Sequence, residues 1–222
     1  MITMQDTEQV VENLTELLKI AKENYSEERY TKVEKMYETL QDRIIVAPAS
    51  GVAHYHSAYA GGYLVHVLNV IKASLKITAV LKAMDGDIDF TKEELVFAAM
   101  HHDLGKLGDL SHPYYIPNTS EWHIKNKGEY FAHDTDIQYM SVPDRSLFLL
   151  QHFGIQITQK EFIAIKLHDG MYGEGNKSYL MNNGKLPMKT NLPYVLHWAD
   201  HISTVAERDQ WKLKEFGEVK TD

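Results

Sequence analysis

The stretch AAMHHDLGK, residues 98–106, decides how the rest of this chain is interpreted. It ends an apolar helical segment with adjacent histidine and aspartate side chains, His102 and Asp103, which can both reach one divalent cation. Imidazole nitrogen and carboxylate oxygen together suit Mn, Fe, Co, Ni, Zn or Mg. Cations of this kind support phosphate-ester chemistry, because they neutralise phosphate oxygens and activate water. The stretch therefore predicts a metal site whose other ligands lie elsewhere in the chain.

The composition fits one medium-sized domain that can bury a core. The chain has 222 residues, of which 44% are hydrophobic and 24% charged, as in ordinary globular proteins. It contains no cysteine, which excludes disulfides and thiolate metal ligands. No continuous run approaches the ~18 apolar residues that span a bilayer, and the first residues lack a signal-peptide layout. We therefore expect a cytoplasmic protein that does not associate with membranes.

The net charge of −8 limits the partners of this chain. A strongly acidic protein repels the phosphates of long nucleic acids, so we expect no binding to them. A nucleotide or a short oligonucleotide remains compatible with the charge, because a metal ion supplies positive charge locally. The chain also has 12 histidines, whose positions matter more than their number.

Hydrophobic residues recur at helical spacing along most of the chain, and no long alternating strand pattern appears. The fold is therefore predicted to be all-α. We expect an N-terminal helical extension over residues 1–44, made of two amphipathic helices that pack on the domain or form a dimer contact. The domain itself is expected over residues 45–207, with a charged tail over 208–222. Its expected helices cover residues 63–81, 91–102, 143–152, 158–168 and 192–207, and capping boxes begin those at Thr91 and Thr158.

Three of the expected helices each carry a candidate metal ligand. His66 lies on the apolar face of the first, and His102 and Asp103 end the second, where an unpaired buried carboxylate is costly without a cation or donor. Asp200 lies within the apolar segment LHWADH of the last helix. The alternatives are a hydrogen-bonded core histidine at His66 and a lysine or arginine partner for Asp200. A ligand from each of three helices is the arrangement that a helical-bundle metal site requires.

The order His66, His102-Asp103 and Asp200, with Lys106 after the pair, resembles the H…HD…D pattern of the HD-domain metal-dependent phosphohydrolase superfamily. The resemblance implies an HD-domain helical bundle in which these two histidines and two aspartates ligate a first metal ion. It extends over residues 45–205 and is similar in detail to the HD domain of bacterial 3′-to-5′ exoribonucleases. The matching segments are IVAPA (45–49), HYH (54–56), GG (61–62), LHDG (167–170) and HWAD (197–200).

The resemblance also implies a cofactor of one or two divalent metal ions. In branches with two metals, further histidines bind the second ion, and the candidates here are His133 and His168, with Asp103 as the bridge. Asp169 stands where the two-metal relatives often carry a second histidine, so both metal counts stay open. With one metal, His133 and His168 would act as the general acid or as substrate contacts.

Lys106 is the candidate for contacting the substrate phosphate, because an ammonium one turn after the ligand pair can reach a nonbridging oxygen. Its alternative role is to complement a helix dipole, worth ~0.3–1 kcal/mol. In the loop that follows, Tyr115 and Trp122 offer rings on which a base could stack, and Lys125 and Lys127 could contact phosphates. The alternative is an ordered surface loop with its aromatic rings in the core.

The resulting hypothesis is a metal-dependent phosphohydrolase, a phosphomonoesterase or phosphodiesterase, that acts on a nucleotide or a short oligonucleotide. The exoribonucleases hold RNA with an additional OB-fold, which residues 1–44 are too few to form. A small nucleotide is therefore at least as well supported a substrate as a short oligonucleotide. One alternative is a non-catalytic HD module that senses a nucleotide or binds a protein. Another is a mixed-valent di-iron oxygenase, whose six ligands are hard to assemble with Asp169 in place of a histidine. The N-terminal helices are compatible with a homodimer.

Overall fold

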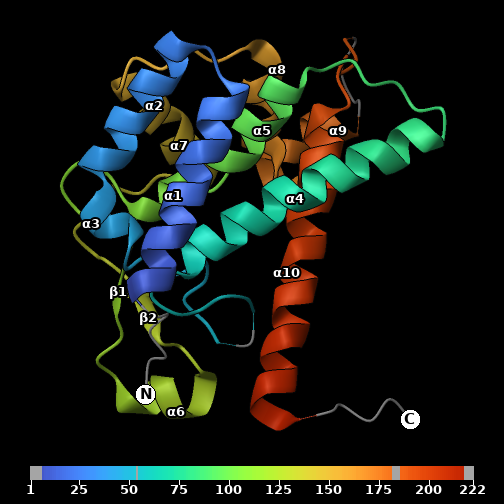
Figure 1. The fold of residues 1–222 in the computed structure, drawn as a ribbon. Helices are drawn as coiled ribbons and strands as arrows, with labels where there is room; N and C mark the ends of the chain where they lie inside the picture. Colours follow the sequence, from blue (N-terminus) through green and yellow to red (C-terminus); the bar gives the residue numbers. More distant parts are fainter. Residues whose placement is uncertain (1–6, 54, 182–185, 218–222) are drawn as a thin grey trace, which may run out of the picture.

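Helices account for most of the computed structural model, which describes residues 7–53, 55–181 and 186–217 (Figure 1). The all-α prediction is confirmed. The α-helices are α1 (Thr7–Asn24), α2 (Glu27–Thr39), α3 (Gln41–Ile44), α4 (Gly62–Ala83), α5 (Lys92–His101), α6 (Glu121–Lys127), α7 (Val142–His152), α8 (Gln159–Leu167), α9 (Lys177–Leu180) and α10 (Leu192–Phe216). The 3-10 helices are η1 (Leu104–Leu107), η2 (Gly170–Tyr172) and η3 (Glu174–Asn176).

Both predicted capping boxes are present and are joined to each other. The Thr91 hydroxyl accepts a hydrogen bond from the Glu94 backbone N–H, and the Glu94 carboxylate accepts one from the Thr91 N–H at 2.9 Å. Thr158 and Glu161 form the same pair of reciprocal hydrogen bonds at the start of α8. The Thr158 hydroxyl also donates to Glu94 Oε1 at 2.9 Å. The first turns of α5 and α8 are therefore fixed side by side.

The centre of the fold is built by α4, α5, α8 and α10. The long helices α4 and α10 cross in Figure 1 and pack against each other, and α8 packs against both α5 and α10. Each of these helices brings one predicted site residue inward: His66 from α4, His102 at the end of α5, His168 at the end of α8 and Asp200 from α10. The three histidines are almost fully buried. The helix packing therefore gathers residues that are far apart in the sequence.

The N-terminal helices belong to the same hydrophobic core. α1 packs against α4 and α5, and residues such as Leu17 and Met36 share one buried cluster with the central helices. Arg29 of α2 joins this region to the central helices, because its guanidinium bonds to Glu93 at 2.9 Å and to Glu161 at 2.6 Å. The break predicted near Tyr25 is confirmed, since α1 ends at Asn24 and Ser26 caps α2.

Two predicted boundaries differ from the structure. α10 does not end near Glu207 but continues to Phe216, because residues 208–216 contain no glycine or proline, and Gly217 then ends the helix with a positive φ of 73°. The expected aromatic loop contains α6 and two antiparallel strands, β1 (Tyr115–Pro117) and β2 (Phe131–His133). Three-residue strands are too short to produce an alternating pattern in the sequence.

One described helix, α4, has the length and the apolar composition that are needed to cross a membrane. This was not predicted from the sequence, because the apolar residues of α4 do not form one continuous run. The core helix of a soluble protein passes the same test. In this structure one face of α4, including Leu64, His66 and Val67, is buried against the other helices.

Candidate metal centre

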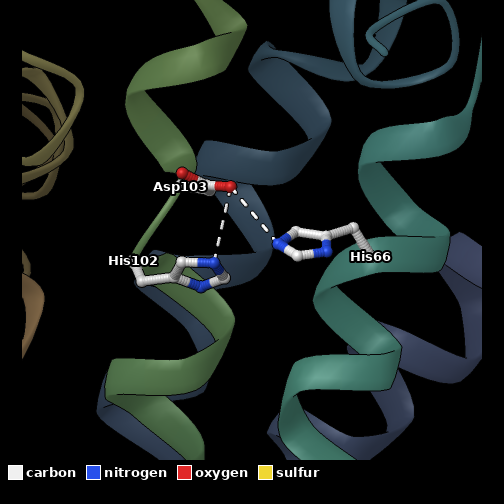
Figure 2. A group of neighbouring side chains, drawn as sticks. All are labelled: His66, His102 and Asp103. Atoms are coloured by element: carbon white, nitrogen blue, oxygen red, sulfur yellow. Dashed lines mark ion pairs between the residues drawn. The ribbon is translucent and has the colours of Figure 1, made fainter. Parts of the chain in front are cut away.

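Two histidines and one aspartate converge in the interior of the fold. Figure 2 shows His66 of α4 facing His102 and Asp103, which follow the last turn of α5. Asp103 Oδ2 lies 3.5 Å from His66 Nε2 and 3.4 Å from His102 Nε2. One potential ligand atom from each residue lies within 4.8 Å of the others, and all three residues are buried. The group can hold a metal ion.

The hydrogen bonds around the site support this interpretation. His66 Nε2 and His102 Nε2 are buried, and neither has a hydrogen-bond partner within the described residues, although carboxylate oxygens lie nearby. Buried polar atoms are nearly always partnered, and leaving one unpartnered costs about 1–3 kcal/mol. A divalent cation would use both nitrogen lone pairs and the carboxylate together. The residues present therefore fit a metal ion.

The backbone fixes which nitrogen of His102 faces the site. Its Nδ1 lies 2.8 Å from the Ala99 carbonyl oxygen, which can only accept a hydrogen bond. Nδ1 must therefore carry the proton, and Nε2 presents its lone pair to the group in the neutral ring. His168 is held in the same way, since its Nδ1 donates to the Ile165 carbonyl at 2.8 Å. Such bonds orient ligand histidines in metalloproteins.

Glu207 orients His66, and sequence analysis missed it. Its Oε1 lies 3.2 Å from His66 Nδ1, which directs Nε2 toward His102 and Asp103. Asn69 donates to the same oxygen at 2.9 Å, and Ser57 Oγ donates to the other at 2.8 Å. The available signal was the position of Glu207, two helical turns after Asp200 on the same face of α10.

The charges at the site favour a cation between the rings. Burial by itself lowers the pKa of His66, but the carboxylates of Glu207 and Asp200 outweigh it and raise the pKa to about 10. Burial by itself raises the pKa of the Asp103 carboxyl, but Lys106 and His102 hold this pKa well below its ordinary value. The carboxylates are therefore ionised and attract positive charge to the space that the histidine nitrogens face.

Asp200, the predicted fourth ligand, lies beside the three-residue group. Its Oδ1 is 3.1 Å from His66 Nε2 and 4.0 Å from His102 Nε2. Burial would raise the pKa of Asp200, but His66 and His102 lower it overall. The structure thus brings all four predicted first-metal ligands together, and coordination by Asp200 stays a prediction.

Lys106 is paired with the central carboxylate. Its Nζ lies 2.7 Å from Asp103 Oδ2 and donates to the Ala49 carbonyl at 2.7 Å. Burial lowers the pKa of Lys106, but Asp103 raises it overall, so the ammonium stays charged. Lys106 is therefore positioned by Asp103 and the Ala49 backbone. Its contact with a substrate phosphate remains a prediction.

The two predicted second-metal residues lie in different surroundings. His168 Nε2 is 3.5 Å from Asp103 Oδ1, so the two oxygens of Asp103 face different histidines, as a bridging carboxylate requires. Burial lowers the pKa of His168, whereas Asp169 and Asp103 raise it to about 9. His133 is exposed, its ring packs on Tyr114 at 4.6 Å, and no ion pair within 4 Å joins it to Asp103 in the described chain. The structure brings His168 into the site but not His133.

The predicted substrate residues are also separated. Burial raises the pKa of Tyr115, whose ring packs on His133 at 5.3 Å and whose hydroxyl interacts electrostatically with Lys106. Trp122 on α6 is 58% exposed, with the Lys127 ammonium 5.4 Å from its ring. Lys125 and Lys127 line a groove of about 650 Å³ that also includes the aromatic residues Tyr55, Tyr130, Trp211 and Phe216. The charges of Lys106 and Asp103 act on the pKa of Tyr115, so this side chain lies near the candidate centre.

The turn after the ligand pair is held by α7, which sequence analysis did not anticipate. Ser146 Oγ accepts from the Gly105 N–H at 2.8 Å and lies 3.0 Å from the His102 carbonyl oxygen. Arg145, fully buried, donates to the Gly105 carbonyl at 3.2 Å. A side chain at Gly105 would meet the Val142 carbonyl at 2.2 Å. Glycine is therefore required for α7 to approach the turn.

Comparison of the chain with family models, with curated proteins and with solved structures finds no match.

Proposed function

We propose that this protein is a metal-dependent phosphohydrolase that hydrolyses a phosphate ester of a nucleotide or a short oligonucleotide. The proposal rests on one observation: the Nε2 atoms of His66 and His102 are buried without hydrogen-bond partners beside the carboxylate of Asp103. Buried polar atoms are nearly always partnered, and a bound cation would account for both nitrogens together with the carboxylate. The HD-type order of these residues in the sequence points to the same chemistry.

The chain offers candidate residues for a first ligand set in this role. His66, His102 and Asp103 would hold a divalent ion, with Asp200 as the fourth protein ligand. When bound there, the ion would neutralise phosphate oxygens and make a water molecule more nucleophilic. Glu207 and the Ala99 carbonyl keep the two histidine rings in the required orientation. These contacts orient both rings without a bound ion.

Lys106 and His168 have positions that suit them to act on the substrate. The Lys106 ammonium is one of the charges nearest the centre, and it can exchange its hydrogen bond to the Ala49 carbonyl for one to a phosphate oxygen. His168 Nδ1 bonds to the Ile165 carbonyl, so its Nε2 faces Asp103 and, when protonated, could pass a proton to the leaving oxygen. In a two-ion form, the same Nε2 would be a ligand, and Asp103 would bridge the ions.

A panel of substrates tests the proposal. Protein loaded with Mn²⁺ or Ni²⁺ would be assayed with deoxynucleoside mono- and triphosphates, cyclic dinucleotides and short 3′-labelled RNA. We expect turnover of at least one class, and its loss in Asp103→Asn. The matched control is Asp136→Asn, which removes an exposed carboxylate and should retain activity. Metal binding without turnover of any member would contradict the proposal and favour a non-catalytic nucleotide-sensing or protein-binding module.

A further inference from the structure

His56 lies beside the metal centre with both ring nitrogens unused. The centroid of its ring is 4.7 Å from that of His66. Its Nδ1 and Nε2 are both buried, and neither has a hydrogen-bond partner in the part of the chain that the structure describes. No element of the first ligand set accounts for this side chain.

The other histidines of the interior show how unusual this arrangement is. His101, His102 and His168 each donate from Nδ1 to a carbonyl oxygen of their own helix, at 2.8 Å in all three cases. A neutral imidazole carries one N–H donor and one acceptor nitrogen, and burying either without a partner is costly. His56 leaves both unpartnered. A bound ligand would supply the partner that His56 lacks among the described residues.

The backbone next to His56 is held in an unfavourable conformation that places the ring over His66. Ser57 has a positive φ of 41°, which is uncommon for any residue with a side chain. Its hydroxyl donates to Glu207, the carboxylate that also orients His66. Its carbonyl oxygen lies so close to Gly62 that a side chain there would approach it to 2.0 Å. Strain that the surrounding structure maintains in this way is typical of functional sites.

His56 and Lys106 are also linked through one residue. The Ala49 carbonyl accepts a hydrogen bond from Lys106 Nζ at 2.7 Å, and the Ala49 N–H donates to the Ser57 carbonyl at 3.1 Å. The ammonium and the imidazole are therefore positioned by the same loop. Two hydrogen-bond donors, Lys106 on η1 and His56 on the loop that Lys106 contacts, lie beside the candidate metal centre and suit an anionic ligand.

We propose that His56 is a substrate-binding residue of this centre and that its ring N–H donates a hydrogen bond to a phosphoryl oxygen of the substrate. This inference rests on the proposed function. His66, His102 and Asp103 form the candidate ligand group without His56. The ring of His56 is then left for contact with the substrate. The ring packs on His66 and adds a neutral donor to the charge that Lys106 supplies.

Binding of inorganic phosphate to the Mn²⁺-loaded protein tests the inference, with Mn²⁺ and phosphate affinities measured separately by isothermal titration calorimetry. His56→Phe keeps the ring volume without a donor, and we expect it to weaken phosphate binding about tenfold or more. It should leave Mn²⁺ affinity within about twofold, because a hydrogen bond to the substrate does not contribute to ion binding. His56→Gln restores an N–H donor and should recover part of the phosphate affinity. His152→Gln, an exposed histidine on α7, is the matched control and should behave as the unchanged protein.

The outcomes separate the two claims. Equal phosphate affinity in the unchanged protein, His56→Phe and His56→Gln would overturn the inference while leaving the metal centre intact. Loss of Mn²⁺ affinity in His56→Phe, in a variant whose circular dichroism spectrum is unchanged, would also overturn it, because His56 would then serve the ion. Failure of the unchanged protein to bind Mn²⁺ would contradict the proposed function itself.

Discussion

Glu207 Oε1 lies 3.2 Å from His66 Nδ1, so a carboxylate in the interior of α10 sets the direction of a histidine on α4. Both side chains are buried, and their residues are 141 positions apart. The contact makes the orientation of His66 depend on how α4 and α10 cross. The arrangement of the candidate metal ligands therefore depends on the helix packing as much as on the ligands themselves.

Glu207→Ala should weaken metal binding without removing a ligand. A lost outer partner of a ligand histidine costs about 10–100-fold in metal affinity, and we expect a decrease in this range when Mn²⁺ is titrated into the variant. Glu207→Gln retains an acceptor oxygen for His66 Nδ1 and should lose less. The control is Glu215→Ala, which removes an exposed carboxylate of the same helix. Unchanged Mn²⁺ affinity in Glu207→Ala would show that His66 does not need this contact.

Ser146→Ala should destabilise the turn that carries His102 and Asp103. The substitution leaves the buried Gly105 N–H without its acceptor, which costs about 1–3 kcal/mol. Urea unfolding, followed by circular dichroism, would measure the change in the free energy of unfolding. Ser178→Ala, at an exposed serine, should stay within about 0.5 kcal/mol of the unchanged protein. Equal stability of the two variants would contradict the role given to α7.

Gly105→Ala tests the same contact by adding atoms. The new Cβ would lie 2.2 Å from the Val142 carbonyl oxygen, and overpacking of this kind costs about 1–3 kcal/mol. We expect a lower unfolding midpoint and weaker Mn²⁺ binding, because the ligand pair must shift with the turn. Gly175→Ala meets nothing within 4 Å and is the matched control. A Gly105→Ala variant as stable as Gly175→Ala would show that α7 can move away from the new side chain without loss of stability.

Arg29→Ala should destabilise the whole fold. Arg29 neutralises Glu161, whose side chain is fully buried, at 2.6 Å. Removing one partner of a buried ion pair costs about 3–5 kcal/mol, since the other charge is left uncompensated. Lys32→Ala breaks an exposed pair with Glu28 on the same helix and should cost less than about 1 kcal/mol. A similar small loss for Arg29→Ala in urea unfolding would mean that α2 does not depend on Arg29.

Local features were predictable because their partners are close in the sequence. The capping boxes at Thr91 and Thr158 need only a glutamate three residues later, and both are present. His102 and Asp103 are neighbours, so their convergence followed from the chain itself. Their meeting with His66 was inferred from a family resemblance, and the structure brings the three together.

The remaining features depend on contacts between distant segments. Glu207 was expected to end a helix, and only the continuation of α10 to Phe216 makes it an interior position. Ser57 and Ser146 reach the centre through a strained turn and through α7, neither of which has a local signature. His133 was predicted to bind a second ion because it lies between the ligand pair and Asp200 in the sequence. In the structure it lies on β2, and its ring packs on Tyr114. Order along a sequence does not fix where a short strand points.

The measurement that tests the metal centre most directly is the Mn²⁺ stoichiometry of purified protein, determined by titration and by elemental analysis after removal of free ion. We expect one or two equivalents in the unchanged protein, and loss of the tight site in His102→Gln, which removes one of the two unpartnered Nε2 atoms. His152→Gln should bind as the unchanged protein does. No bound Mn²⁺ in the unchanged protein, or equal binding in His102→Gln, would contradict the account.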